Sequence, residues 1–205
     1  MTETASDPPA APDYIAHSRL LGAAYEVASD VHAGPLGSGR VSLRHPVAVA
    51  TLLHDEGYPE HVVAAALLHD VVEDGGLAPQ AMEQRFGPQV AGLVARLTED
   101  ESIASYPRRK AALRSQAVGD GPEAAAIFAA DKLASARSAL RREGAPSARK
   151  LEHYERSLWL LKARYPELPF LAELEADLTR LRARPQARSG GGAPAAARSA
   201  RPAAG

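Results

Sequence analysis

The stretch LLHDVVED, residues 67–74, places one histidine and three carboxylates at the end of an apolar run. The polar residues are His69, Asp70, Glu73 and Asp74. On a helix that turns 100° per residue, their side chains fall within a sector of about 140°. A solvent-facing stripe on an amphipathic helix is the simplest explanation for an isolated acidic cluster of this kind.

The turns before this cluster argue against a solvent-facing stripe. Val62, Val63 and Ala66 occupy the same sector, and the opposite side carries leucine and valine, so residues 60–74 are apolar all round. A helix that is apolar all round is usually buried. Carboxylates at the end of a buried helix are costly unless another group compensates their charge. A divalent cation is the simplest compensation.

Two further residues are candidate ligands beside His69 and Asp70. His45 begins the preceding helix in RHPVAVATLL, and antiparallel packing of two consecutive helices would bring it near His69. Asp131 is an isolated acid in the apolar segment AAIFAADKLASAR. Taken singly, His45 would be explained by a hydrogen bond at the helix terminus, and Asp131 by a buried salt bridge. Together, two imidazoles and two carboxylates predict a site for Mn²⁺, Fe²⁺ or Zn²⁺.

The rest of the chain predicts helices and no strands, so the expected fold class is all-α, a multi-helix bundle. Apolar residues recur at helical spacing, and Gly/Pro turns separate the segments. Residues 1–12 are expected to be a disordered lead, 13–183 one domain, and 184–205 a disordered low-complexity tail. The expected helices span 14–31, 45–56, 60–72, 79–85, 88–97, 106–117, 122–142, 147–165 and 167–182.

Composition limits the possible functions. The 205 residues contain no cysteine, which excludes disulfides, thiol catalysis and cysteine-based zinc sites. A net charge of −1 gives no argument for a nucleic-acid or membrane partner. No apolar run approaches the roughly 20 residues that span a bilayer, and the N-terminus lacks a secretion signal, so a cytoplasmic location is expected.

The motifs carry a resemblance. The order His … His-Asp … Asp resembles the HD-domain metallohydrolase pattern. RHPVAVATLL, AAALLHDVVED, FGPQVAGLVARLTED, PRRKAAL and AADKLASAR are similar to the hydrolase domain of RelA/SpoT proteins, and the stand-alone small alarmone hydrolases are similar in length. The resemblance implies an HD-domain bundle that uses Mn²⁺ to remove the 3′-pyrophosphate of guanosine tetra- and pentaphosphate, (p)ppGpp.

Carried over by motif, the resemblance assigns roles to individual residues. His45, His69, Asp70 and Asp131 become the metal ligands. Glu73 and Asp74 become the pair that orients and deprotonates the attacking water. The basic segment PRRKAAL contributes Arg109 and Lys110 as phosphate contacts. The alternative is that these residues form a basic turn exposed to solvent.

The segments that would read the nucleotide depart from the family pattern. The loop before His45 lacks the usual nucleotide-holding residues and offers Arg40 and Arg44, and Ser135 stands where the family carries asparagine. Arg40 and Ser135 are therefore further candidate substrate contacts, and weak guanine preference is expected. The alternatives are hydrolysis of another nucleotide phosphate and a nucleotide-sensing module without turnover.

Overall fold

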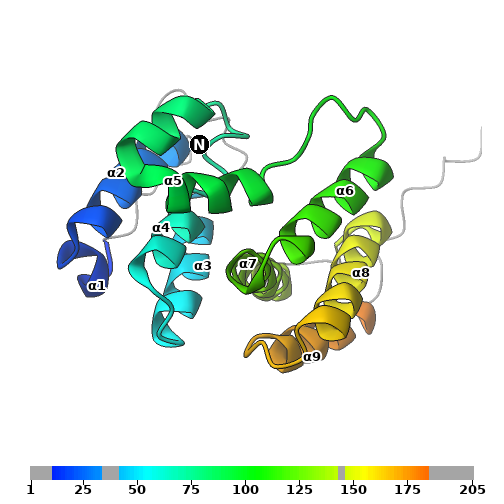
Figure 1. The fold of residues 1–205 in the computed structure, drawn as a ribbon. Coiled ribbons are helices and arrows are strands. Elements are labelled where there is room, and N and C mark those ends of the chain that lie inside the picture. Colours follow the sequence, from blue (N-terminus) through cyan, green and yellow to red (C-terminus); the bar gives the residue numbers. More distant parts are fainter. Residues whose placement is uncertain (1–10, 34–41, 143–145, 185–205) are drawn as a thin grey trace, which may run out of the picture.

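The computed structural model describes residues 11–33, 42–142 and 146–184, and all regular elements in these ranges are α-helices (Figure 1). This confirms the all-α expectation. The helices are α1 (Asp13–Ala16), α2 (Arg19–Ala33), α3 (Arg44–Asp55), α4 (Glu60–Leu68), α5 (Pro79–Leu97), α6 (Tyr106–Gly119), α7 (Pro122–Arg141), α8 (Ala148–Arg164) and α9 (Leu171–Arg182).

Two helices form the centre of the bundle because they are apolar on every side. All residues of α4 from Val62 to Leu68 are buried, as are those of α7 from Ala124 to Ala130. Small alanine side chains dominate both segments, which allows neighbouring helices to approach closely. Polar groups attached to either segment are therefore held in a well-packed environment.

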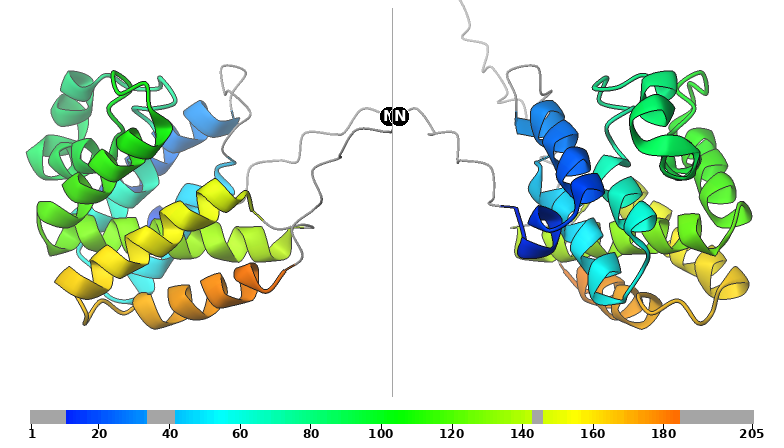
Figure 2. Two further views of the ribbon diagram at one scale, coloured as in Figure 1. Left: turned by 90° about the vertical axis from the view of Figure 1, so that its right-hand side faces the viewer. Right: turned by 60° about the vertical axis from the view of Figure 1, so that its left-hand side comes forward.

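The other helices surround this centre. α4 packs against α2, α3, α5 and α7, whereas α7 packs against α3, α6, α8 and α9 as well as α4 and α5. Figure 1 shows α7 end-on, with α3 and α4 on one side and α6, α8 and α9 on the other; Figure 2 shows the same arrangement from two further directions. The shared neighbour α3 brings its first turn to both central helices.

The structure corrects two helix boundaries near the motif. The helix expected over 14–31 is divided at His17 and Ser18, and the Ser18 hydroxyl accepts the N–H of Leu21 as an N-cap of α2. The helix expected over 60–72 ends at Leu68, and Val71 N–H bonds to Leu68 O in the turns that follow. The helical-wheel positions of Glu73 and Asp74 were therefore wrong.

Other expectations differ in smaller ways. The helices expected over 79–85 and 88–97 are joined as α5, with a kink at Gly87, whose φ of 82° is accessible to glycine. Trp159, in α8, is 72% exposed. Arg184, assigned to the tail, donates to the carbonyls of Ala139 and Arg142. No helix in the described ranges is long and apolar enough to cross a membrane.

Candidate metal centre and active site

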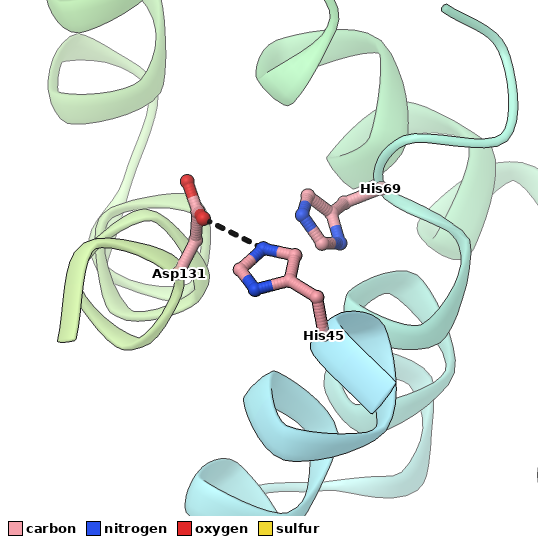
Figure 3. Close-up of side chains that lie close together, drawn as sticks. All are labelled: His45, His69 and Asp131. Carbon is pink, nitrogen blue, oxygen red and sulfur yellow. Dashed lines mark hydrogen bonds and ion pairs between the residues drawn. The ribbon is translucent and has the colours of Figure 1, made fainter. Parts of the chain in front are cut away.

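Three helices each contribute one candidate metal ligand to a compact cluster. His45 comes from the first turn of α3, His69 from the residue that ends α4, and Asp131 from the middle of α7. One potential ligand atom from each lies within 4.8 Å of the other two, and Figure 3 shows the three side chains turned toward one another. His45 Nε2 lies 3.0 Å from Asp131 Oδ1. The sequence prediction that these distant residues meet is confirmed.

His69 has the tautomer that a metal ligand requires. Its Nδ1 lies 2.8 Å from Ala66 O, which can only accept a hydrogen bond, so Nδ1 carries a proton. In the neutral ring Nε2 then holds a lone pair. Nε2 is buried and makes no hydrogen bond, although Asp70 Oδ2 lies 3.2 Å away. Nε2 and the Asp70 carboxylate therefore face each other across a position that suits a positive group, either a proton or a metal ion.

The charges around this cluster favour a positive group. Burial opposes a charged His69, yet Asp70 and Asp131 together raise the pKa of its imidazole. Burial likewise opposes a charged Asp131, but Lys132 and His45 hold the pKa of that carboxyl well below its usual range. Asp131 therefore stays ionised. Two imidazoles and ionised oxygen ligands suit a divalent first-row cation, so the residues present fit one.

Lys132 is a site residue that the sequence did not identify, because a lysine after an acid is usually exposed. Only 6% of its surface is accessible, and its ammonium bonds to Asp131 and lies 4.4 Å from the centre of the Phe128 ring. It lines the same cavity as the three ligands. The fold thus places a buried cation next to the candidate metal centre.

The structure separates the two acids that follow His69 and Asp70. Glu73 lines the cavity and accepts the backbone N–H of Glu99 at 2.6 Å. Burial raises the pKa of Glu73 to about 7; the hydrogen bond from the Glu99 N–H opposes this rise, and the negative charges of Asp70 and Glu99 add to it. Asp74 does not line the cavity; its Oδ2 lies 3.3 Å from Nδ1 of the buried His32. The structure therefore brings Glu73, but not Asp74, to the cavity.

Arg109 and Lys110, near the start of α6, form ion pairs with Glu99, an acid that the sequence did not identify. Glu99 bonds to both Arg109 and Lys110, with 2.6 Å between Arg109 Nε and Glu99 Oε2. Although burial opposes it, these two cations lower the pKa of Glu99. Lys110 lines the cavity with Glu99, whereas Arg109 does not and also donates to Ile103 O at 3.0 Å.

The remaining predicted contact that can be located is Ser135. It lies one turn beyond Asp131 on α7, and its hydroxyl is 3.4 Å from Asp131 Oδ1. It lines the cavity, which has a volume of 570 Å³. Arg40 lies outside the described residues. The cavity size is in the range of pockets that bind small organic ligands.

His153 is a further residue that lines this cavity. Its Nδ1 lies 2.8 Å from Nη1 of the buried Arg114. Because arginine only donates, Nδ1 accepts and Nε2 carries the proton. Burial, with the charges of Lys132, Lys110 and Arg114, lowers the pKa of His153 to about 2. The imidazole is therefore neutral, and its tautomer is fixed.

Comparisons of the sequence with known proteins identify relatives of this chain. The human guanosine-3′,5′-bis(diphosphate) 3′-pyrophosphohydrolase MESH1 is 35% identical over 128 residues, which cover 60% of this chain and 71% of the human protein. The bifunctional (p)ppGpp synthase/hydrolase SpoT of Escherichia coli is 40% identical over 94 residues, 45% of this chain. The match spans only 13% of that larger protein.

Solved structures resemble the chain over most of its length. A structure described as a metazoan ortholog of SpoT that hydrolyses ppGpp aligns with a TM-score of 0.63 and 27% identity, covering 80% of this chain and 94% of that one. The lmo0812 protein of Listeria monocytogenes aligns with a TM-score of 0.54 and 31% identity, covering 67% and 97%. The sequence model of the HD domain matches residues 24–159. Because this match covers more than half of its length, the chain belongs to the HD-domain family.

Proposed function

We propose that the protein is a metal-dependent phosphohydrolase that removes the 3′-pyrophosphate of (p)ppGpp. The observation that carries the proposal is the buried Nε2 of His69, which has no hydrogen-bond partner and lies beside Asp70, His45 and Asp131 in a cavity of nucleotide size. The names of the human and bacterial relatives supply the reaction and the substrate class. Hydrolysis at a histidine-carboxylate cluster requires a bound cation and a base. The candidate cation ligands and the candidate base Glu73 both line the cavity.

The proposed metal site consists of His45, His69, Asp70 and Asp131, and Mn²⁺ is the proposed ion. When bound, a divalent cation supplies Lewis-acid polarisation of a phosphoryl oxygen. The protein's own contribution is to fix the ligands. Ala66 holds the His69 ring, and Lys132 keeps Asp131 ionised.

The proposed base is Glu73. Water attacks the phosphorus attached to O3′ and the bond between that phosphorus and O3′ breaks, so pyrophosphate carries the oxygen of the water, and O3′ leaves on the nucleoside and takes up a proton from solvent. Glu73 in its ionised form accepts the proton from the water. A carboxylate with a pKa of about 7 has a basicity suited to this task near neutral pH.

Two lysines neutralise charge on the transferred group. Lys110 and Lys132 line the cavity and are each anchored by an acid, Glu99 and Asp131 respectively. Such pre-positioned cations stabilise phosphoryl charge as it develops. Asp74 remains assigned to the reaction through the family resemblance, and its contact with His32 supports a positioning role for it. The proposal includes a cytoplasmic location, where the nucleotide substrates occur.

The direct test is hydrolysis of guanosine 5′-diphosphate 3′-diphosphate by the purified protein with Mn²⁺, followed by detection of pyrophosphate and guanosine 5′-diphosphate. Activity should disappear with a chelator and in the variant Asp131→Asn. The control His61→Ala removes an imidazole that pairs with Glu123 outside the cavity and should remain active. Release of orthophosphate in place of pyrophosphate, or full activity in Asp131→Asn, would reject the proposed reaction.

A further inference from the structure

The single tryptophan of the chain lies on the surface of α8, away from the catalytic cavity. Trp159 is 72% exposed, and it is the large apolar side chain that the described part of the chain leaves in contact with solvent. Tryptophan carries a large apolar area and is enriched at the centres of protein interfaces. Its exposure therefore raises the question of what covers it. Figure 2 shows α8 (yellow) and α9 (orange) side by side at one side of the bundle.

A groove between α8 and α9 lies beside this tryptophan. It has a volume of 600 Å³, and its apolar lining includes the buried side chains of Leu158 and Leu178. None of the described residues lines both this groove and the catalytic cavity. The groove and Trp159 are called the α8/α9 face below. A partner bound at this face would leave the cavity open.

Four charged side chains alternate in sign around the α8/α9 face. On α8, Glu155 lies one turn before Trp159 and Lys162 lies one turn after it. On α9, Glu175 and Arg182 lie about two turns apart. Lys162 Nζ lies 2.9 Å from Glu175 Oε1, and Arg182 Nη1 lies 3.5 Å from Glu155 Oε1, so the two helices are antiparallel here. Such exposed ion pairs contribute little to the fold itself and stay available to a partner.

This alternation makes the face complementary to a second copy of itself. A two-fold rotation about an axis in the plane of the face, parallel to the helices, places α8 of one copy opposite α9 of the other. Glu155 then faces Arg182 of the partner subunit, and Lys162 faces Glu175 of the partner subunit. A face with one sign of charge would instead repel its own copy. Because the four charges balance, they give no attraction for nucleic acid or an anionic membrane.

We propose that the α8/α9 face is the interface of a homodimer in which each Trp159 enters the groove of the other copy. A buried tryptophan usually finds an acceptor for its N–H, and the groove presents the Thr179 hydroxyl and the carboxylates of Glu155 and Glu175. An apolar centre with a charged rim is the usual composition of an interface. One groove makes a small interface, so the dimer is reversible, with a dissociation constant in the micromolar range. This dimer is independent of the proposed reaction.

The single tryptophan makes the proposed interface directly observable. Sedimentation velocity of the 205-residue chain across the micromolar range should show a 21.6 kDa species converting to one of twice that mass. Over the same range, the emission of Trp159 should shift to shorter wavelength and its quenching by iodide should decrease. Trp159→Ala should weaken the dimer by about 30-fold or more. The control Arg156→Ala removes a cation that pairs with Glu152 outside the groove, and it should dimerise like wild type.

A charge exchange tests the arrangement of the two copies. Lys162→Glu places acids opposite each other and should weaken the dimer, whereas Lys162→Glu/Glu175→Lys restores opposite charges and should recover it. A protein that stays monomeric across the micromolar range, or a dimer unaffected by Trp159→Ala, would overturn the inference. A short-wavelength emission that does not depend on concentration would also overturn it, because a segment of the same chain would then cover the tryptophan. Failure of the double variant to recover the dimer would overturn the proposed pairing of α8 with α9.

Discussion

The carboxylate of Glu73 accepts a hydrogen bond from the backbone N–H of Glu99, 26 residues later in the chain, at 2.6 Å. This bond joins the turn after the His-Asp pair to the residues that follow α5. Glu99 in turn bonds to Arg109 and Lys110 at the start of α6. The proposed base and the proposed phosphate-binding Lys110 are therefore positioned by one shared residue.

The first prediction concerns the base. Glu73→Gln keeps an oxygen that can accept the Glu99 N–H but cannot take a proton from water. We expect kcat to fall by about 10²–10⁴-fold, which is typical for loss of a general base, while metal content is unchanged. Steady-state kinetics and elemental analysis measure the two quantities. A smaller loss is expected for Asp74→Asn, because Asp74 lies against His32 outside the cavity. Equal rates in wild type and Glu73→Gln would contradict the assignment.

The second prediction concerns stability in the metal-free protein. The folded state holds the pKa of Glu73 at about 7, above its ordinary value of 4.5. The folded state therefore binds this proton more tightly than the unfolded state. Its contribution to the free energy of unfolding is full below about pH 4.5 and is lost as the pH rises through about 7.

Glu73→Gln removes this dependence and isolates it from other titrating groups. Urea unfolding in the presence of a chelator should show that wild type loses on the order of 1–3 kcal/mol relative to the variant between pH 4.5 and 8. The difference between the two proteins cancels the opposing contributions of His32, with its lowered pKa, and His69, with its raised pKa. A constant difference across this range would show that Glu73 titrates normally.

Helical periodicity was sufficient to predict the bundle because α4 and α7 are buried all round and their sequences show it directly. His69 and Asp131 were predictable as candidate ligands because each is a polar residue in or directly after such a segment. Ser18, a standard N-cap residue, could have revealed the break before α2. The end of α4 was harder to predict, since it coincides with a contact within the site: His69 Nδ1 donates to Ala66 O, the carbonyl that a continuing helix offers to the next turn.

Residues that act through tertiary contacts were not predictable from local sequence. Lysine and histidine side chains are commonly at least partly exposed in proteins. Lys132 and His153 are buried at the cavity only because α6, α7 and α8 pack around them. Glu99 lies just after a predicted helix, and no motif or periodicity in the sequence marks it as a site residue. Its partners are ten and eleven residues away, a separation set by the turn between α5 and α6. Glu73 and Asp74 diverge for the same reason, because regular helix geometry does not extend to them.

The third prediction concerns metal binding. A ligand that binds the folded state at 100 times its Kd stabilises it by about 2.7 kcal/mol, which raises the Tm of a protein of this size by about 5–10 °C. We expect saturating Mn²⁺ to produce such a shift in wild type and in His61→Ala. His69→Ala and Asp131→Asn should show none. Differential scanning calorimetry measures the shift independently of any activity. An unchanged Mn²⁺ response in both ligand variants would place the metal elsewhere.

The fourth prediction concerns the buried pair of Arg114 and His153. Arg114→Met leaves His153 Nδ1 buried without a donor, which should cost about 1–3 kcal/mol in the free energy of unfolding. His153→Phe leaves the Arg114 guanidinium without its partner and should cost a similar amount or more. The double variant replaces both groups with apolar ones and should recover part of the loss. Strict additivity of the two single variants would show that the pair is not coupled.

The last prediction concerns base selectivity. Ser135 has a single hydroxyl, which lies 3.4 Å from Asp131 Oδ1 and is therefore directed toward the metal cluster. It reaches less far and forms fewer hydrogen bonds than an asparagine at the same position would. A site that encloses a substrate without hydrogen-bonding it discriminates weakly between similar groups. We therefore expect guanosine and adenosine 3′-pyrophosphates to differ in kcat/KM by less than about 10³-fold with Mn²⁺.

The variant Ser135→Asn tests the cause of this weak selectivity. A carboxamide one turn beyond Asp131 adds both a donor and an acceptor to the cavity wall, so the guanosine-to-adenosine ratio should rise. Ser138→Asn is the matched control, because it adds the same group to the same cavity one turn further from Asp131. A wild-type ratio above about 10³, or an equal rise in both variants, would show that base recognition does not depend on position 135.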